Sequence, residues 1–344
     1  MNVLEKYFRG DKVVWVVVML LSITSILTVY SSIVTLAYKH TDGNTFYYLI
    51  KHSSFLIIGL LLTYFTHNIK YTYFSKLSQL LLYLSIPLLL LTLVMGSTIN
   101  DASRWLTIPI LNYTFQTSDL AKFALIMYLA RIISKKQDNI KDFKSAFIPI
   151  ILPVLVVCGL ILPANLSTAA LLFITSIILM FIGRVNIKYI LSLIGIGVAG
   201  LTVVILIGMA FPGTIKRVDT WVNRIEDFRE GNVTENYQSE QSKIAIATGG
   251  VFGKGPGKST QRNFLPHPYS DFIYAIVIEE YGLIGGILLL FLYLILLFRG
   301  IRISSSSDKP FGTLLVFGFS FSLVFQAMIN MAVAVNLFPV TGQP

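Results

Sequence analysis

The chain has 344 residues, of which 55% are hydrophobic and only 13% are charged, and its mean hydropathy is +0.73. This composition excludes an ordinary soluble globular protein and predicts an integral membrane protein. The net charge of +10 would also suit a nucleic-acid-binding protein, but no basic helix or aromatic RNA-binding platform accompanies it, so we predict no nucleic-acid partner.

The apolar segments, taken in chain order, are long enough to cross about 30 Å of hydrocarbon. Lipid offers no partners to backbone N–H and C=O groups, so each segment is predicted to be a helix. The nine segments begin near Val13, Ser53, Ser78, Asp119, Ala146, Leu166, Tyr189, Phe272 and Phe311. We therefore expect an all-α polytopic membrane protein with nine transmembrane helices and no competing sheet.

The distribution of Lys and Arg predicts how these helices are oriented. With a cytoplasmic N-terminus, fifteen basic residues fall in inside segments and only three fall in short outside loops. This asymmetry follows the positive-inside rule. The first span is longer than a signal-peptide core and lacks a cleavage site, so we expect it to stay attached. The sequence thus predicts a multi-pass membrane protein with a cytoplasmic N-terminus.

Two outside segments are too polar and too organised to be simple connectors: residues 96–118 and residues 212–270. We predict that the longer one is a half-embedded extracytoplasmic cap loop, since it contains scattered aromatic and aliphatic residues. Within it, Ser242–Val251 predicts a short interfacial helix that runs into a glycine-rich turn. The run from Gly253 to Ser259 is one residue short of a phosphate-binding P-loop and lacks its preceding strand, which argues against an ATPase. Its glycines would still let backbone amides approach a pyrophosphate lipid.

Ionisable residues within predicted spans are costly and mark candidate functional positions. Lys122 lies about one turn into the fourth span; it either snorkels outward or is an amine that needs an acidic partner. Asp271 at the outer start of the eighth span is the best partner, although Asp is also a favoured helix N-cap. Glu279 and Glu280 lie about 12 to 14 Å further along a straight helix. We expect them to serve packing or cavity support.

Arginine side chains in the outside segments have planar guanidinium groups suited to phosphate. Together with a lone carboxylate on the same side of the membrane, they indicate an anionic, lipid-linked substrate. These arginines are Arg104, Arg217, Arg224 and Arg229. The single cysteine, Cys158, lies in an apolar span and is expected to have a packing role, and the four histidines show no metal-ligand spacing.

Three ordered motifs resemble the SEDS family (shape, elongation, division and sporulation) of peptidoglycan polymerases, typified by FtsW and RodA. Arg104-Trp105 followed by the segment from Gln116 to Lys122 is similar to the family's R-W and Q-P-S-E-L-A-K. The stretch from Gln241 to Gly255 resembles Q-S-x-x-A-I-x-x-G-G-x-x-G-x-G. The third block, residues 264–285, resembles L-P, T-D-F-I-F and E-E-x-G-x-x-G. The resemblance covers nearly the whole chain.

The resemblance implies a ten-span inverting glycosyltransferase that polymerises lipid II on the outer face of the membrane. It also implies a cognate penicillin-binding transpeptidase and other division proteins as partners. Asp271 would be the essential carboxylate and Lys122 its ionic neighbour. The supporting or substrate-binding candidates are Arg104, Gln116, Arg217, Arg224, Gln241, Glu279 and Glu280. The one cofactor left open is a divalent cation, Mg²⁺ or Mn²⁺.

Two departures from the family pattern affect these expectations. The P-D-L-G-T segment is replaced by Ala164-Asn-Leu-Ser-Thr168, so we assign no catalytic role to Asn165. The chain ends inside the family's T-G-x-P-L-P loop, so we expect a single SEDS-type domain over residues 1–344 that lacks a tenth span. A division role is favoured by the segment Met331–Pro339. The alternatives are a flippase or transporter of a lipid-linked precursor and a non-catalytic division scaffold.

Overall fold

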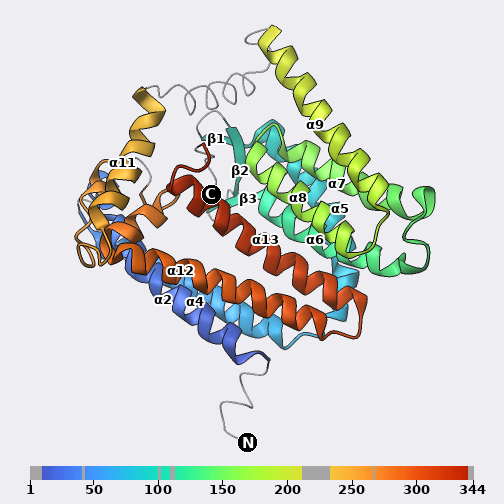
Figure 1. Ribbon diagram of the computed structural model, residues 1–344, viewed down its shortest axis with the longest axis horizontal. Helices are drawn as coiled ribbons and strands as arrows, with labels where there is room; N and C mark the ends of the chain where they lie inside the picture. The colour runs from blue at the N-terminus through green and yellow to red at the C-terminus, as the bar shows by residue number, and fades with distance from the viewer. Residues whose placement is uncertain are drawn as a thin grey trace, which may run out of the picture. The chain divides into compact units, whose positions relative to one another are not determined.

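The computed structural model describes residues 10–40, 43–99, 102–108, 113–210, 233–265 and 268–339. The chain is predominantly helical (Figure 1) and divides into two compact units. Unit 1 comprises Met1–Asn68, Asn223–Arg299 and Val324–Pro344, and unit 2 comprises Ile69–Val222 and Gly300–Leu323.

Helices occupy the positions of all nine predicted spans, which confirms the fold class. In chain order they are α2 (Lys12–Ser32), α4 (Thr45–His67), α5 (Thr72–Met95), α6 (Thr117–Lys135), α7 (Ile148–Ile161), α8 (Leu166–Ile182), α9 (Ile187–Ala210), α12 (Ile273–Ser305) and α13 (Pro310–Ala334). A π-helical turn, Phe143–Phe147, precedes α7. Among the described residues, seven helices are long and apolar enough to cross a membrane. The exact number of spans stays a prediction, because α8 has only 17 residues and α6 carries several charges.

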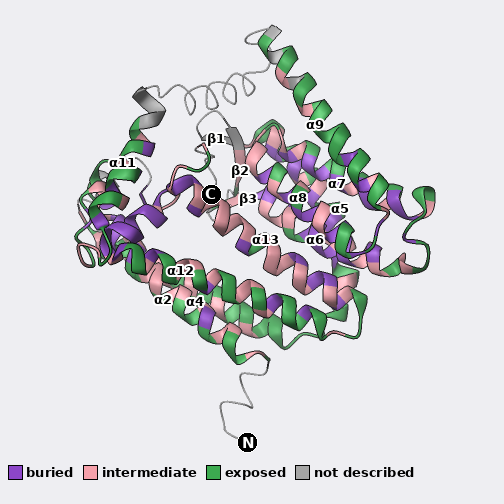
Figure 2. Ribbon diagram, viewed as in Figure 1, coloured by how far each residue is buried: buried purple, intermediate pink, exposed green. Residues whose placement is uncertain are grey.

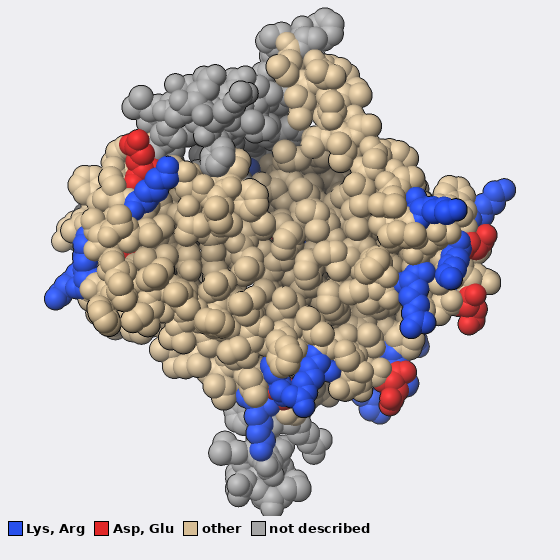
Figure 3. All heavy atoms as spheres, viewed as in Figure 1, with Lys and Arg blue, Asp and Glu red and all other residues tan. Residues whose placement is uncertain are grey.

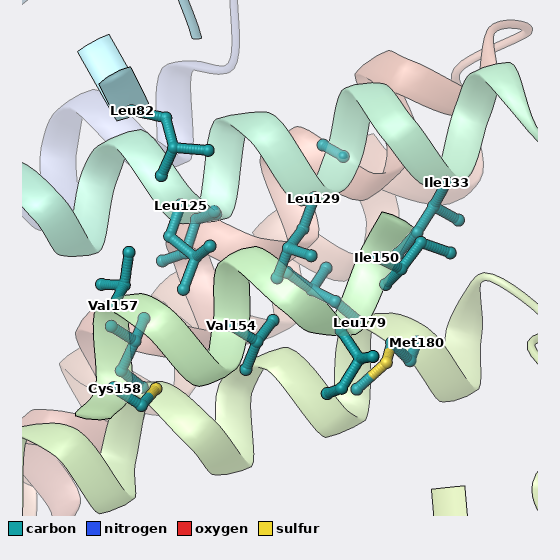
Figure 4. Packing of buried hydrophobic residues seen from close by; sticks show 14 of the residues in the cluster. Leu82, Leu125, Leu129, Ile133, Ile150, Val154, Val157, Cys158, Leu179 and Met180 are labelled. Carbon is teal, nitrogen blue, oxygen red and sulfur yellow. The ribbon is translucent and has the colours of Figure 1, made fainter. Parts of the chain in front are cut away.

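Unit 2 is built around a continuous apolar core that α5, α6, α7 and α8 share. Figure 4 shows Leu125, Leu129 and Ile133 of α6 facing side chains of α7 and α8. Small residues bring the helix backbones close together: Ala121 and Ala124 on α6 have no exposed surface. The same core buries Cys158, which confirms its predicted packing role.

In unit 1, α2 is tied to α12 near each of its ends. At one end Asp11 caps α2 and accepts a hydrogen bond from Arg299 Nε at 2.9 Å. At the other end Ser31 Oγ donates to the carboxylate of Glu280. The two ties are separated by 20 residues along α2, from Asp11 to Ser31, or about 30 Å of helix rise. This length matches the hydrocarbon thickness of a bilayer.

The surface of α4 shows why the composition is so apolar. This helix of unit 1 has no buried residue. Large apolar side chains such as Phe55 and Leu62 have half or more of their surface exposed. Exposed segments coloured green run along several helices in Figure 2, and most of the described surface drawn in Figure 3 carries no Lys, Arg, Asp or Glu. Lipid, not water, is the solvent that suits such a surface.

The first outside segment contains a small antiparallel sheet, β1 (Ser97–Ile99), β2 (Ala102–Ile108) and β3 (Tyr113–Gln116), in the order β1-β2-β3. The expectation of no sheet was wrong here, because three strands of three to seven residues are too short to show a period of two beside long apolar runs. The register pairs Trp105 with Gln116, which brings the two halves of the first motif side by side.

Candidate active site

A helix and a glycine-rich turn are present in unit 1 where the sequence predicted them, and the interfacial placement of the helix stays a prediction. Helix α11 (Val233–Gly249) ends in a turn with a positive φ at Gly250, Gly253, Gly255 and Gly257, and a short 3-10 helix, η3 (Gln261–Asn263), follows. The segment that carries these glycines, residues 250–265, is called the glycine loop below. It contacts α12 at a point where that helix is broken.

The break lies at Gly282, whose φ of 71° and ψ of −175° are not helical. It separates a short helix, Ile273–Tyr281, from the long remainder of α12. Tyr274 Oη donates to the carbonyl oxygen of Gly286 at 3.2 Å, a contact that a straight helix of this spacing does not allow, so the short helix folds back. The prediction of one uninterrupted span from Phe272 was therefore wrong at Gly282, because an uninterrupted apolar run hides a backbone break. Glu279 and Glu280 still lie eight and nine residues after Asp271, at the far end of the short helix.

The glycines serve close approach of two backbones. A Cβ on Gly249 would lie 2.2 Å from the carbonyl oxygen of Ile278, and one on Gly253 would lie 2.3 Å from that of Glu280. Lys254 N donates to Glu279 O at 2.9 Å and Gly255 N donates to Glu280 O at 2.9 Å. These two amides are thus committed to the end of the short helix, which removes them from the predicted contact with a pyrophosphate lipid.

Glu279 is completely buried and surrounded by donors of the glycine loop. Oε1 accepts from Lys254 Nζ at 2.6 Å, from Thr260 N at 3.0 Å and from Thr260 Oγ1 at 2.9 Å. Oε2 accepts from Ser259 Oγ and, at 3.3 Å, from Gln261 N. A carboxylate with both oxygens occupied in this way is suited to holding structure rather than to proton transfer.

Glu280 is also buried but less completely paired. Oε1 accepts from Ser31 Oγ and from Ser259 N, the latter at 3.3 Å. Oε2 has no hydrogen-bond partner among the residues that the structure describes. Arg262 Nη1 donates to the carbonyl oxygen of Ser31 at 2.9 Å, so the glycine loop reaches the end of α2 as well.

Asp271 lies in the turn Pro268–Phe272, which leads directly into the short helix. Its side chain is partly exposed, unlike those of Glu279 and Glu280. Burial raises the pKa of the neighbouring Tyr269 phenol, and the negative charges of Tyr48 and Asp271 add to this effect. The described helix begins two residues after Asp271, and its role as an N-cap stays a prediction.

In unit 2, two predicted residues lie in the small sheet, Arg104 on β2 and Gln116 on β3, and Lys122 lies on α6, which follows β3. Arg104 Nε donates to the carbonyl oxygen of Ala164 at 3.0 Å, and Gln116, only 4% exposed, donates from Nε2 to Ser118 Oγ at 2.8 Å. Lys122 forms an ion pair with Asp119 at 3.2 Å, one turn away on α6. A cavity lined by Arg104 and neighbouring side chains has a volume of about 20 Å³. It has room for one water molecule but not for a sugar.

The structure therefore groups the predicted site residues into two sets. Unit 1 holds Asp271, Glu279 and Glu280, with Gln241 on α11, whereas unit 2 holds Arg104, Gln116 and Lys122. The ionic pairing of Asp271 with Lys122 stays a prediction, since the two residues belong to different units. Arg217, Arg224 and Arg229 lie outside the described residues, as does the first part of the cap loop.

The divalent cation stays a prediction. Within the described part of the chain, no group of three His, Cys, Asp or Glu side chains is placed to hold a metal ion. Glu279 already accepts bonds on both oxygens, so it does not fit the role of a metal ligand. We therefore assign no chemical step to a metal.

The sequence interpretation missed the residues that surround the two glutamates. They are Ser31, Lys254, Ser259, Thr260 and Arg262. One signal was available: Lys254 and Lys258 interrupt a glycine-rich turn next to Ser259 and Thr260, a pattern of donors that needs an acceptor. The identity of that acceptor depends on long-range packing.

A family model described as Cell cycle protein, which covers FtsW, RodA and SpoVE, matches residues 11–344. The chain belongs to this family. It is 33% identical to stage V sporulation protein E of Bacillus subtilis, over 96% of this chain and 89% of that protein. It is 32% identical to a probable peptidoglycan glycosyltransferase FtsW of Trichlorobacter lovleyi, over 99% of this chain and 89% of that protein. The resemblance found in the motifs is confirmed.

Solved structures of low sequence identity share the fold. One is a chain from a study of polymerization and crosslinking by a peptidoglycan synthase complex, with a TM-score of 0.75 and 22% identity over 98% of this chain and 90% of that one. Another is the rod shape determining protein RodA of Thermus thermophilus, with a TM-score of 0.66 and 22% identity over 98% of this chain and 89% of that one. These matches establish the fold of this FtsW/RodA/SpoVE family member.

Proposed function

We propose that the chain is a peptidoglycan glycosyltransferase that polymerises lipid II on the outer face of the bacterial cytoplasmic membrane, in septal cell division. The observation that carries this proposal is the match to one family over residues 11–344, with relatives above 30% identity that are named for this activity. The third motif block, residues 264–285, also holds Asp271, Glu279 and Glu280.

Asp271 is the proposed general base. The 4-hydroxyl oxygen of the acceptor sugar attacks the anomeric carbon of the donor, and Asp271 takes the hydroxyl proton as the new C–O bond forms. The bond from the anomeric carbon to the phosphate oxygen breaks, and the lipid pyrophosphate leaves with the electron pair. Direct displacement inverts the anomeric configuration. A side chain that is partly exposed and lies in a turn can meet a substrate, whereas the fully buried Glu279 cannot.

Cationic side chains are proposed to stabilise the charge that develops on the leaving pyrophosphate. Lys122 and Arg104 in unit 2, together with Arg217 and Arg224, supply the candidates. Arginine is suited to this role because its guanidinium fork matches phosphate geometry.

A penicillin-binding transpeptidase is the proposed partner, since one protein of the same fold was solved in a synthase complex. The N-terminus is proposed to be cytoplasmic. The basic residues follow this arrangement, and it leaves Asp271 on the outer side, where lipid II units are joined.

Polymerisation of purified lipid II by the chain with its cognate transpeptidase tests this function. We expect glycan strands from the wild type and a loss of about 10²- to 10⁴-fold for Asp271→Asn, the usual contribution of a general base. Asp138→Asn, at an exposed acidic residue of unit 2, is the matched control and should keep full activity. If the wild type makes no strands beside an active transpeptidase, the proposal fails and transport or scaffolding becomes the better explanation.

A further inference from the structure

We infer that Glu279 is a positioning residue, which acts through the short helix Ile273–Tyr281 to fix the place of Asp271. This inference rests on the proposed function, because it assigns Glu279 a part in that reaction. It needs no contact between Glu279 and substrate. Glu279 holds the glycine loop, and the loop in turn holds the short helix that follows Asp271.

The first observation is that the carboxylate of Glu279 gathers the glycine loop around itself. Its five hydrogen bonds come from four residues, Lys254, Ser259, Thr260 and Gln261. These donors span eight residues of loop that contain no long helix or strand. A loop without its own core needs such an acceptor to hold one conformation.

The second observation is that the ordered loop touches the short helix at both ends. At the C-terminal end, Lys254 N and Gly255 N bond to the carbonyl oxygens of Glu279 and Glu280. At the N-terminal end, Leu265 packs in a buried cluster with Phe272 and Ile276. Phe272 is the immediate neighbour of Asp271. The loop that Glu279 organises is thus the same loop that packs beside the proposed base.

The third observation is that the short helix is not held by continuity with the rest of α12. The backbone break at Gly282 interrupts the helix directly after Tyr281. The direction of the short helix therefore depends on side-chain contacts and on the loop, with Tyr274 Oη to Gly286 O as one further tie. Loosening the loop would displace the turn that carries Asp271 without unfolding the membrane helices.

Steady-state polymerisation with Glu279→Gln tests the inference. The amide keeps the size of the side chain but places an NH₂ group among donors. We expect kcat to fall about 10- to 100-fold while KM for lipid II stays within about twofold, since small misplacement of a reacting group costs rate rather than binding. Glu240→Gln, at an exposed glutamate on α11, is the matched control and should leave both constants unchanged.

A second set of variants covers the case in which Glu279→Gln alone does not fold. Lys254→Met with Glu279→Gln removes both charges of the ion pair and leaves no unpaired buried charge. Lys254→Arg keeps the positive charge and should retain at least half of the wild-type kcat. The double variant should show the kcat loss in protein that still purifies as a monodisperse species.

Hydrogen–deuterium exchange separates positioning from a purely structural role. We expect faster exchange in peptides covering residues 254–276 of the double variant, with α4 and α5 unchanged. Lowered thermal stability across the whole chain with an unchanged kcat in the folded fraction would overturn the inference. If the wild type does not polymerise lipid II, the proposed function fails. Even then, faster exchange of the double variant that is confined to residues 254–276 supports the link between Glu279 and the glycine loop. Unchanged exchange in those residues refutes that link.

Discussion

Gly282→Ala should be markedly more disruptive than alanine at Gly257, a glycine of the same unit that has room for a Cβ. At φ 71° and ψ −175°, a non-glycine residue costs about 1–3 kcal/mol. The added Cβ would also lie 2.2 Å from Val251 O and 2.5 Å from Gly253 N, both backbone atoms. Such overpacking costs a further about 1–3 kcal/mol. The expected destabilisation is therefore about 2–6 kcal/mol.

Thermal unfolding of the purified protein in detergent measures this effect. With an unfolding entropy of about 2.1 cal/mol/K per residue, a chain of this length loses about 1.4 °C of Tm per kcal/mol, so we expect a decrease of about 3–8 °C. Gly257→Ala is the matched control: its φ is 73°, but nothing lies within 4 Å of the added Cβ. It should cost about 1–2 kcal/mol, or about 1–3 °C. Equal shifts for the two variants would refute the argument that the backbones pack too closely for a side chain.

Two further predictions concern stability. Asp11→Asn keeps the cap of α2 but removes the negative charge beside Arg299. In the wild type, the hydrogen bond from Arg299 holds the pKa of Asp11 below its usual value. The ion pair therefore stabilises the fold by about 1 kcal/mol above about pH 4, and this stabilisation is lost as the pH falls through the lowered pKa. The difference in Tm between wild type and variant should accordingly close on acidification, and a constant difference would contradict the assignment. Leu125→Ala, in the fully buried core of unit 2, should cost about 2–5 kcal/mol, against less than about 1 kcal/mol for Leu80→Ala at a position 64% exposed, both measured by thermal unfolding.

Hydropathy predicted the membrane helices well because the bilayer imposes one requirement on every span. Runs such as the one from Val13 and the one from Tyr189 need no knowledge of their neighbours to be identified as helices. The family motifs likewise located the carboxylates of unit 1. Both signals are local in sequence.

The break in α12 could not be predicted in the same way. Glu279-Glu280-Tyr-Gly282 lies within an otherwise continuous apolar pattern, and glycine is common in membrane helices without breaking them. The break is stabilised by bonds from Lys254 and Gly255, about 25 residues earlier. The strands around Trp105 escaped prediction for a related reason, since their pairing is set by the partner strand and not by their own short pattern.

The two ties between α2 and α12 also make the chain sensitive to the thickness of its membrane. Asp11 with Arg299 and Ser31 with Glu280 hold polar groups about 30 Å apart along α2. A thicker bilayer would draw one polar pair into hydrocarbon, and a thinner one would bare apolar surface between them, so mismatch must be met by tilting both helices together or by deforming the lipid. Because Glu280 adjoins Glu279 at the break, such tilting would be felt directly by the loop beside Asp271. The acyl-chain length of the surrounding lipid is thus expected to affect the tilt of α2 and α12 and, through Glu280, the loop beside Asp271.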